Sequence, residues 1–189
     1  MFNFIDLKKV IMKYLSPLEM MYKWEVEKAD MVYLSQPIEG VSHNWTYKET
    51  MNEVRKMASY IKSLNLDRNS KIAILSKNCA HWIMTDLAIM MSGHVSVPLY
   101  PNLNAETLNK ILLHSETQLL FVGKLDDFGK MKSGIPDWMT CITYPFYSED
   151  YPQWNDLTKD VVLVAPNTDG GGTGTLTVND EIEDFRVVF

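Results

Sequence analysis

The chain has 189 residues, of which 46% are hydrophobic and 22% charged, and its formal net charge is -6 at pH 7. These values exclude a disordered or collagen-like chain, and the negative charge, without a basic stripe of interleaved aromatics, disfavours nucleic-acid binding. No apolar run predicts an integral membrane segment. Cys79 and Cys141 lack CxxC or Cys/His spacing, so we expect reduced thiols in a cytoplasmic protein, with neither a zinc site nor a disulfide framework.

The first 17 residues form an amphipathic pattern, with apolar side chains at helical spacing at Phe4, Leu7, Val10, Ile11 and Tyr14. Charged residues at positions 6, 8 and 9 interrupt any signal-peptide core, so no secretory signal is predicted. Such a helix can rest on lipid or dock on the protein's own core, and we favour docking.

Residues 18–29 predict a short helix, and residues 30–47 predict a β-hairpin with Pro37 and Gly40 between its extended runs. Thr46 and Glu49 have the spacing of a capping box, in which each side chain binds a free amide at a helix start. The apolar period that follows predicts a helix over residues 47–64 with one buried face.

From residue 71 the chain alternates between strands and helices. The pattern predicts strands at 71–75, 95–100, 118–122 and 140–144, and helices at 79–92, 105–114 and 125–132. Strands joined by crossover helices run parallel, so we predict an α/β fold: a doubly wound, mostly parallel sheet flanked by helices, with an N-terminal β-hairpin and a β-rich C-terminal tail.

Two single residues and three loops mark the expected ends of these helices and strands. Gly93 is the expected helix stop, because glycine tolerates the left-handed backbone found there. Pro98 lacks an amide donor and is expected near a strand end or on an edge strand. The loops at 76–78, 100–104 and 123–127 follow strands, so they lie at the carboxyl edge where open α/β sheets hold ligands.

Composition changes near residue 161. Residues 1–160 hold 17 basic and 19 acidic side chains, whereas residues 161–189 hold one basic and five acidic side chains. We therefore predict an α/β subdomain over 1–160 and an acidic, glycine-containing, β-like tail over 161–189.

None of the candidate chemical motifs is complete. Residues 169–175 read DGGGTGT after an apolar run, but they lack the lysine of a Walker loop and the helix of a dinucleotide fingerprint, so a turn or linker is favoured. Cys79 opens a helix, which can lower a thiol pKa, but it has no partner base. Asp126 and Asp127 are expected to cap a helix. The histidines are spread over different elements, and we expect packed or surface roles for all of them: His43, His81, His94 and His114.

Residues 44–130, which include WTYKE and KIAILSKNCAHWIMTDLAIMMSGHVSVPLYPNLNAETLNKILLHSETQLLFVGKLDDF, resemble the N-terminal part of adenylate-forming enzymes (AMP-dependent synthetases and ligases). The likeness is strongest to long-chain fatty-acyl-CoA synthetases. It implies a two-step reaction in the full-length enzyme: a fatty acid carboxylate attacks the α-phosphate of ATP, and the coenzyme A thiol then displaces AMP from the acyl-adenylate. ATP, Mg²⁺ and coenzyme A are the implied cofactors of that longer protein.

The chain departs from the family in the segment where the phosphate loop [ST]-S-G-T-T-G-x-P-K-G is expected. GGGTGT has no following proline and lysine, and the nucleotide-binding segments and the C-terminal domain of the family are also missing. We therefore expect no catalytic, cofactor-binding or metal-ligating residue and no activity of this chain alone. It is then the N-terminal part of a synthetase, partnered by the remainder of the enzyme or by a second copy. Alternatively, it is a stand-alone binding or interaction module whose tail completes the sheet.

Overall fold

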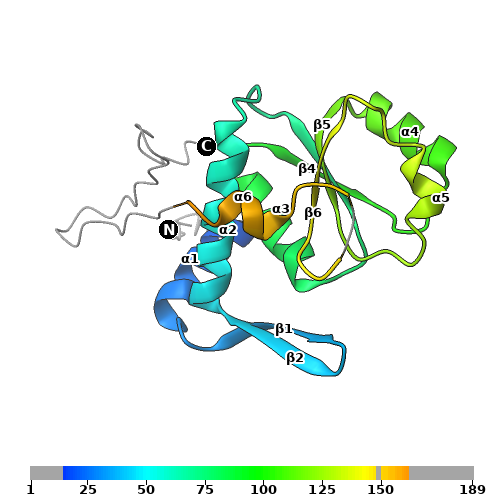
Figure 1. Ribbon diagram of the computed structural model, residues 1–189. Helices are drawn as coiled ribbons and strands as arrows, with labels where there is room; N and C mark the ends of the chain where they lie inside the picture. Colours follow the sequence, from blue (N-terminus) through cyan, green and yellow to red (C-terminus); the bar gives the residue numbers. More distant parts are fainter. Residues whose placement is uncertain (1–14, 148–149, 162–189) are drawn as a thin grey trace, which may run out of the picture.

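A four-stranded parallel sheet forms the centre of the computed structural model, which describes residues 15–147 and 150–161 (Figure 1). The strand order is β4-β3-β5-β6, and every neighbouring pair is parallel. The strands are β3 (Lys71–Leu75), β4 (Val95–Leu99), β5 (Thr117–Val122) and β6 (Thr140–Thr143). This confirms the predicted parallel α/β sheet.

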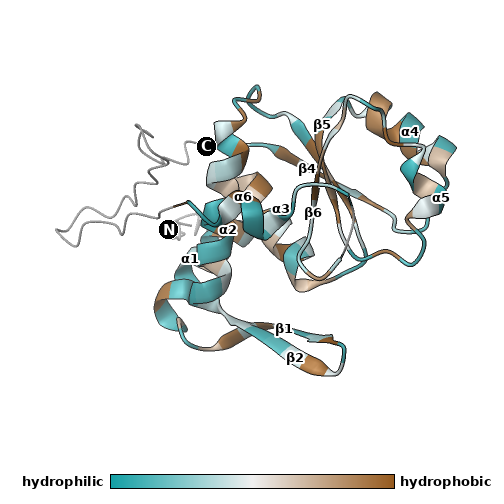
Figure 2. Cartoon of the chain, viewed as in Figure 1, coloured by the Kyte–Doolittle hydropathy of each residue, from teal (hydrophilic) through white to brown (hydrophobic). Residues whose placement is uncertain are grey.

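Helices cover both faces of this sheet, as Figure 1 shows. One face packs against α1 (Pro17–Glu27), α2 (Tyr47–Ser63), α3 (Ala80–Met91) and α6 (Trp154–Thr158). The other face packs against α4 (Ala105–His114) and α5 (Gly129–Lys132). Successive strand residues point to opposite faces, so neighbours such as Phe121 and Val122 belong to different core clusters. The strands are therefore apolar on both sides, and Figure 2 shows hydrophobic residues along the middle of the sheet.

The hairpin predicted over residues 30–47 is confirmed as β1 (Val32–Ile38) and β2 (Val41–Thr46), an antiparallel pair that projects beside α2 (Figure 1). Its turn holds Glu39 at φ 50° and Gly40 at φ 81°, two consecutive left-handed residues that suit a tight hairpin. The turn therefore centres on residues 39 and 40. Of the two residues expected between the runs, Gly40 lies in the turn, but Pro37 lies within β1 opposite Ser42.

The two single-residue predictions around β4 are confirmed. Gly93 follows the end of α3 with φ 81°. β4 is an edge strand, and Pro98 lies on it opposite Ile74. An edge strand has one side without a partner strand, so a residue without an amide donor fits there.

The helix predicted over 125–132 is too long, because α5 begins only at Gly129. The preceding loop is held by contacts with the loop after β3, among them a hydrogen bond in which the Lys124 carbonyl accepts the Lys77 amide at 2.8 Å and an ion pair between Asp126 and the Lys77 ammonium. Sequence periodicity also missed α6, which has only five residues. The predicted β-rich tail lies outside the described residues.

The capping box at the start of α2 is confirmed. Thr46 Oγ1 accepts the Glu49 amide at 3.1 Å, and Glu49 Oε2 accepts the Thr46 amide at 2.8 Å. Replacing Thr46 with alanine leaves one helix amide without its partner, so we expect a loss of about 1 kcal/mol in the free energy of unfolding. Urea unfolding checks this value, with Thr46→Ser as the control that keeps the hydroxyl. Equal losses in both variants would contradict the assigned cap.

Candidate functional site

The loops after β3 and β5 meet at the carboxyl edge of the sheet, where the chain turns toward β4 in one case and β6 in the other. In open α/β sheets this switch point is the usual ligand crevice. Here Ser76 joins the two loops: its hydroxyl accepts the Lys124 amide at 2.9 Å and donates to the Lys77 carbonyl at 2.7 Å. A Cβ added to Gly123 would lie 2.5 Å from Ser76 Oγ. The two loops are therefore packed against each other at the switch point.

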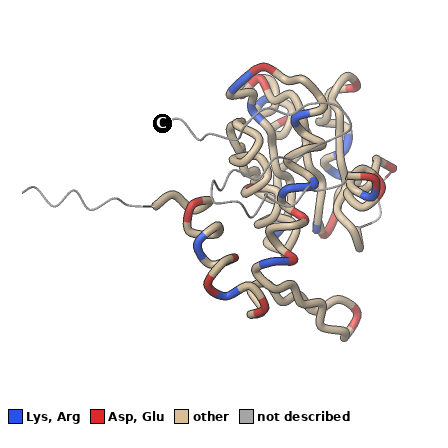
Figure 3. The backbone as a smooth tube through the Cα atoms, turned by 90° about the vertical axis from the view of Figure 1, so that its left-hand side faces the viewer, with Lys and Arg blue, Asp and Glu red and all other residues tan. Residues whose placement is uncertain are grey.

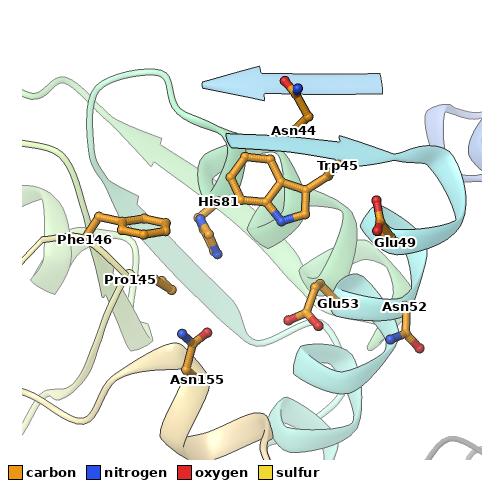
Figure 4. Close-up of a pocket in the computed structure, with 9 residues that line it drawn as sticks. All are labelled: Asn44, Trp45, Glu49, Asn52, Glu53, His81, Pro145, Phe146 and Asn155. Atoms are coloured by element: carbon orange, nitrogen blue, oxygen red, sulfur yellow. The ribbon is translucent and has the colours of Figure 1, made fainter. Parts of the chain in front are cut away.

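A pocket of about 370 Å³ lies at the carboxyl end of β6, between the hairpin and the helices α2, α3 and α6 (Figure 4). We call it the His81 pocket, because the imidazole of His81 projects into it from the first turn of α3. Its other lining residues come from β2, α2, α6 and the loop after β6: Asn44, Trp45, Glu49, Asn52, Glu53, Pro145, Phe146 and Asn155. Two strand and helix elements that follow each other, β2 and α2, thus form its wall together with α3, α6 and the loop after β6.

His81 is only 4% exposed, and aromatic rings surround it. Its ring centroid lies 5.3 Å from that of Trp154 and 5.7 Å from that of Trp45, in edge-to-face geometry. Burial lowers the pKa of His81 to about 4, against the smaller opposing effect of Glu53, so the imidazole is neutral at pH 7. Its Nδ1 is buried and has no hydrogen-bond partner among the described residues.

The two carboxylates of the His81 pocket already have structural partners. Glu53 accepts Lys56 Nζ at 2.9 Å and Trp154 Nε1 at 3.2 Å. Glu49 caps α2, and its hydrogen bonds with Thr46 lower its pKa. Within residues 15–147 and 150–161 no group of three histidine, cysteine or acidic side chains is arranged to hold a metal ion.

The other candidate residues lie in ring contacts, in ion pairs, at a helix start or away from the His81 pocket. His43 packs on Phe146 with ring centroids 4.9 Å apart. The expectation that Asp126 and Asp127 cap a helix is wrong, because the N-cap of α5 is Phe128 and no side-chain hydrogen bond caps this helix. Asp126 pairs with Lys77, and Asp127 pairs with Lys130 at 2.6 Å. Cys79 is the N-cap of α3, and burial raises the pKa of its thiol, so the helix start does not produce a lowered pKa. His94 and His114 lie beyond this pocket. Figure 3 shows basic and acidic residues interspersed along the described chain.

No described helix is long and apolar enough to cross a membrane.

A family model described as "AMP-binding enzyme" matches residues 23–167. The chain belongs to this family. Among its relatives, the long-chain-fatty-acid--CoA ligase FadD15 of Mycobacterium bovis is 31% identical over 102 residues, which are 54% of this chain and 17% of that protein. Long chain acyl-CoA synthetase 2 of Arabidopsis thaliana is 35% identical over 81 residues, 42% of this chain and 12% of that protein. This AMP-binding family chain therefore matches only a small part of the length of these relatives.

Solved structures of adenylate-forming ligases share the fold of this AMP-binding family chain. Coronafacic acid ligase from Pectobacterium brasiliense superposes with a TM-score of 0.66 at 20% identity, covering 77% of this chain and 29% of the ligase. The anthranilate CoA ligase AuaEII, in complex with anthranoyl-AMP, gives a TM-score of 0.65 at 16% identity, with 77% and 28% covered. At these identities the likeness establishes the fold, and the resemblance seen in the sequence is confirmed at the level of the family.

Acidification is expected to destabilise this AMP-binding family chain through His81. The folded-state pKa of about 4 lies below the ordinary value of 6.5, so near pH 5 the unfolded chain binds a proton that the folded chain does not. The stability that comes from keeping His81 neutral in the folded chain is present above pH 6.5 and is lost as the pH falls toward 4. We expect a loss of about 2 kcal/mol between pH 7.5 and 5, measured by urea unfolding.

Matched variants separate His81 from the other titrating groups. His81→Gln should remove this part of the pH dependence, whereas His114→Gln, at an exposed position, should keep it. An unchanged pH dependence in His81→Gln would show that the buried imidazole does not cause the effect.

Proposed function

We propose that this chain is the N-terminal part of an ATP-dependent long-chain fatty acid:CoA ligase. The full-length enzyme would form a fatty acyl-adenylate from ATP and then transfer the acyl group to coenzyme A, with Mg²⁺ offsetting phosphate charge. The observation that carries this proposal is the 31–35% identity to long-chain ligases over stretches that make up 12–17% of those proteins.

We also propose that the chain is inactive on its own. The glycine-rich run after residue 160, GGGTGT, is not followed by the proline and lysine expected of the family's phosphate loop. The loops at the switch point are joined by a hydrogen bond from the Lys124 amide to Ser76. Glu49 and Glu53 already accept hydrogen bonds from Thr46 and Trp154, respectively. These features support a role in which the described residues form a scaffold, and the remainder of the synthetase supplies the chemistry.

In this proposal residues 1–160 form the α/β subdomain and residues 161–189 an acidic tail, in a cytoplasmic enzyme. The partner that completes the subdomain is the rest of the synthetase or a second copy of the chain. Large apolar side chains are exposed on the described surface and are available for such a contact: Val32, Val41, Val95 and Tyr100.

A second candidate function is a stand-alone binding or interaction module. The two hydrophobic core clusters favour it, because the described residues alone bury large side chains on both faces of the sheet, such as Trp154 on one face and Leu108 on the other, both at 0% exposure. A domain whose sheet already packs against helices on both faces does not require a partner to fold.

The coding sequence downstream of residue 160 distinguishes the two functions. For a ligase, transcripts should contain a continuing frame with the [ST]-S-G-T-T-G-x-P-K-G loop and the C-terminal lysine domain. A module predicts transcripts that all stop after the tail, together with a monomeric purified protein. The second result would contradict the ligase proposal.

A further inference from the structure

A second cavity, of about 380 Å³, lies between α1 and α3, and we call it the α1–α3 groove. Its walls are mostly apolar and come from both helices and β1: Met20, Trp24, Tyr33, Ile83, Leu87 and Met90. Most of these side chains are only partly buried by the described residues. Covering an apolar groove of this kind with a further apolar segment stabilises the protein, because apolar surface is removed from water.

Asp86 is the one charged residue in the lining of the α1–α3 groove. It is half-buried on α3, and its carboxylate forms no hydrogen bond or ion pair with the residues that the structure describes. A partly desolvated carboxylate is stabilised by a nearby positive charge. The groove therefore suits an occupant with an apolar face and basic side chains beside it.

The first 14 residues of the same chain have this chemistry. Their amino-acid sequence places Phe4, Leu7, Ile11 and Tyr14 on one helical face. They also contain three lysines, Lys8, Lys9 and Lys13, against the single acidic residue Asp6. As a helix, 14 residues would extend about 21 Å, enough to cover a groove between two helices.

Chain connectivity favours this occupant over a second molecule. Leu15, the first described residue, lies in the groove wall, so the preceding segment is attached directly beside the groove. A segment on such a short connection has an effective concentration in the millimolar range. At micromolar protein concentration, a second copy or a soluble partner competes poorly with it.

We propose that residues 2–14 dock as an amphipathic helix in the α1–α3 groove of their own chain. Phe4, Leu7 and Ile11 face the groove, and a lysine at its margin offsets the charge of Asp86. The docked segment covers one side of the α/β body and restrains the start of α1. This proposal does not depend on the ligase function.

Photocrosslinking of the 189-residue chain tests the register of docking. Benzoylphenylalanine in place of Ile11 should give an intramolecular crosslink that mass spectrometry maps to peptides containing Met20 or Met90. The same probe in place of Lys13 is the matched control, because positions 11 and 13 lie on opposite sides of a helix. We expect at least a fivefold higher yield from position 11. Asp86→Asn should lower that yield about threefold, since it removes the paired charge but keeps the side-chain shape.

Three outcomes would overturn the proposal. Equal yields from positions 11 and 13 would show that no specific face docks. Crosslinks that join two chains at micromolar concentration would assign the groove to a second copy. If vesicles of phosphatidylcholine and phosphatidylglycerol bind the chain and abolish the crosslink, the apolar face belongs to a lipid surface.

Discussion

Replacing Trp154 with alanine is expected to lower the free energy of unfolding by about 4 kcal/mol, which is a large fraction of the stability of an average domain. The indole is fully buried, and its ring centroid lies 6.1 Å from that of Phe121 and 6.3 Å from that of Tyr144. Its Nε1 donates to Glu53 at 3.2 Å. The variant therefore loses apolar burial, leaves a cavity and removes a hydrogen-bond donor from Glu53.

Guanidinium unfolding followed by far-UV circular dichroism measures this loss without relying on tryptophan fluorescence. Trp138→Ala is the matched control, because Trp138 is 61% exposed and its replacement should change the stability by less than about 0.5 kcal/mol. Trp154→Phe should fall between the two, since it keeps a ring but removes the donor. Similar stability for Trp154→Ala and Trp138→Ala would contradict the docking of α6 on α2 and α3.

Gly134→Ala is expected to destabilise the chain by about 3 kcal/mol, at the upper end of the range for overpacking. A Cβ at this position would lie 2.1 Å from the backbone oxygen of Ala105, at the start of α4. Backbone atoms of a helix cannot rotate away as a side chain can. The clash is relieved only if the turn after α5 separates from α4, which also strains the hydrogen bond from Asn109 Nδ2 to the Gly134 carbonyl.

Gly129→Ala provides the control in the same segment. Its Cβ would meet Asp127 Oδ1 at 3.6 Å, an ordinary contact, and alanine is a better helix former than glycine. We expect this variant to be as stable as the parent chain or more stable in urea unfolding. Equal destabilisation by the two substitutions would show that α5 and α4 do not pack as closely as described.

The elements of the sheet could be predicted from sequence because their signals are local. A strand such as Thr117–Val122 is a short apolar run between turn residues, and α2 combines a capping box with a sustained helical period. Parallel pairing then follows from the crossover helices. The family resemblance was predictable for the same reason, since it lies in one continuous stretch.

The His81 pocket could not be predicted, because its wall combines residues from β2, α2, α3 and α6 that are up to about 110 positions apart. A lone histidine in an apolar helix gives no signal for the aromatic rings that surround it. The environment of Cys79 also depends on distant residues: the local helix start favours a thiolate, but burial disfavours it more strongly. The shortened α5 likewise reflects contacts with the loop after β3, which the local sequence does not encode.

Exchange of radioactive pyrophosphate into ATP, with palmitate as the acid, tests the central claim that this chain is a scaffold without the adenylate-forming machinery. The purified chain, with its fold verified by circular dichroism, is compared with a buffer blank and with a full-length long-chain fatty acid:CoA ligase. We expect exchange with the full-length enzyme and none above the blank with this chain. Exchange that increases with the concentration of this chain, and requires palmitate, would contradict the account.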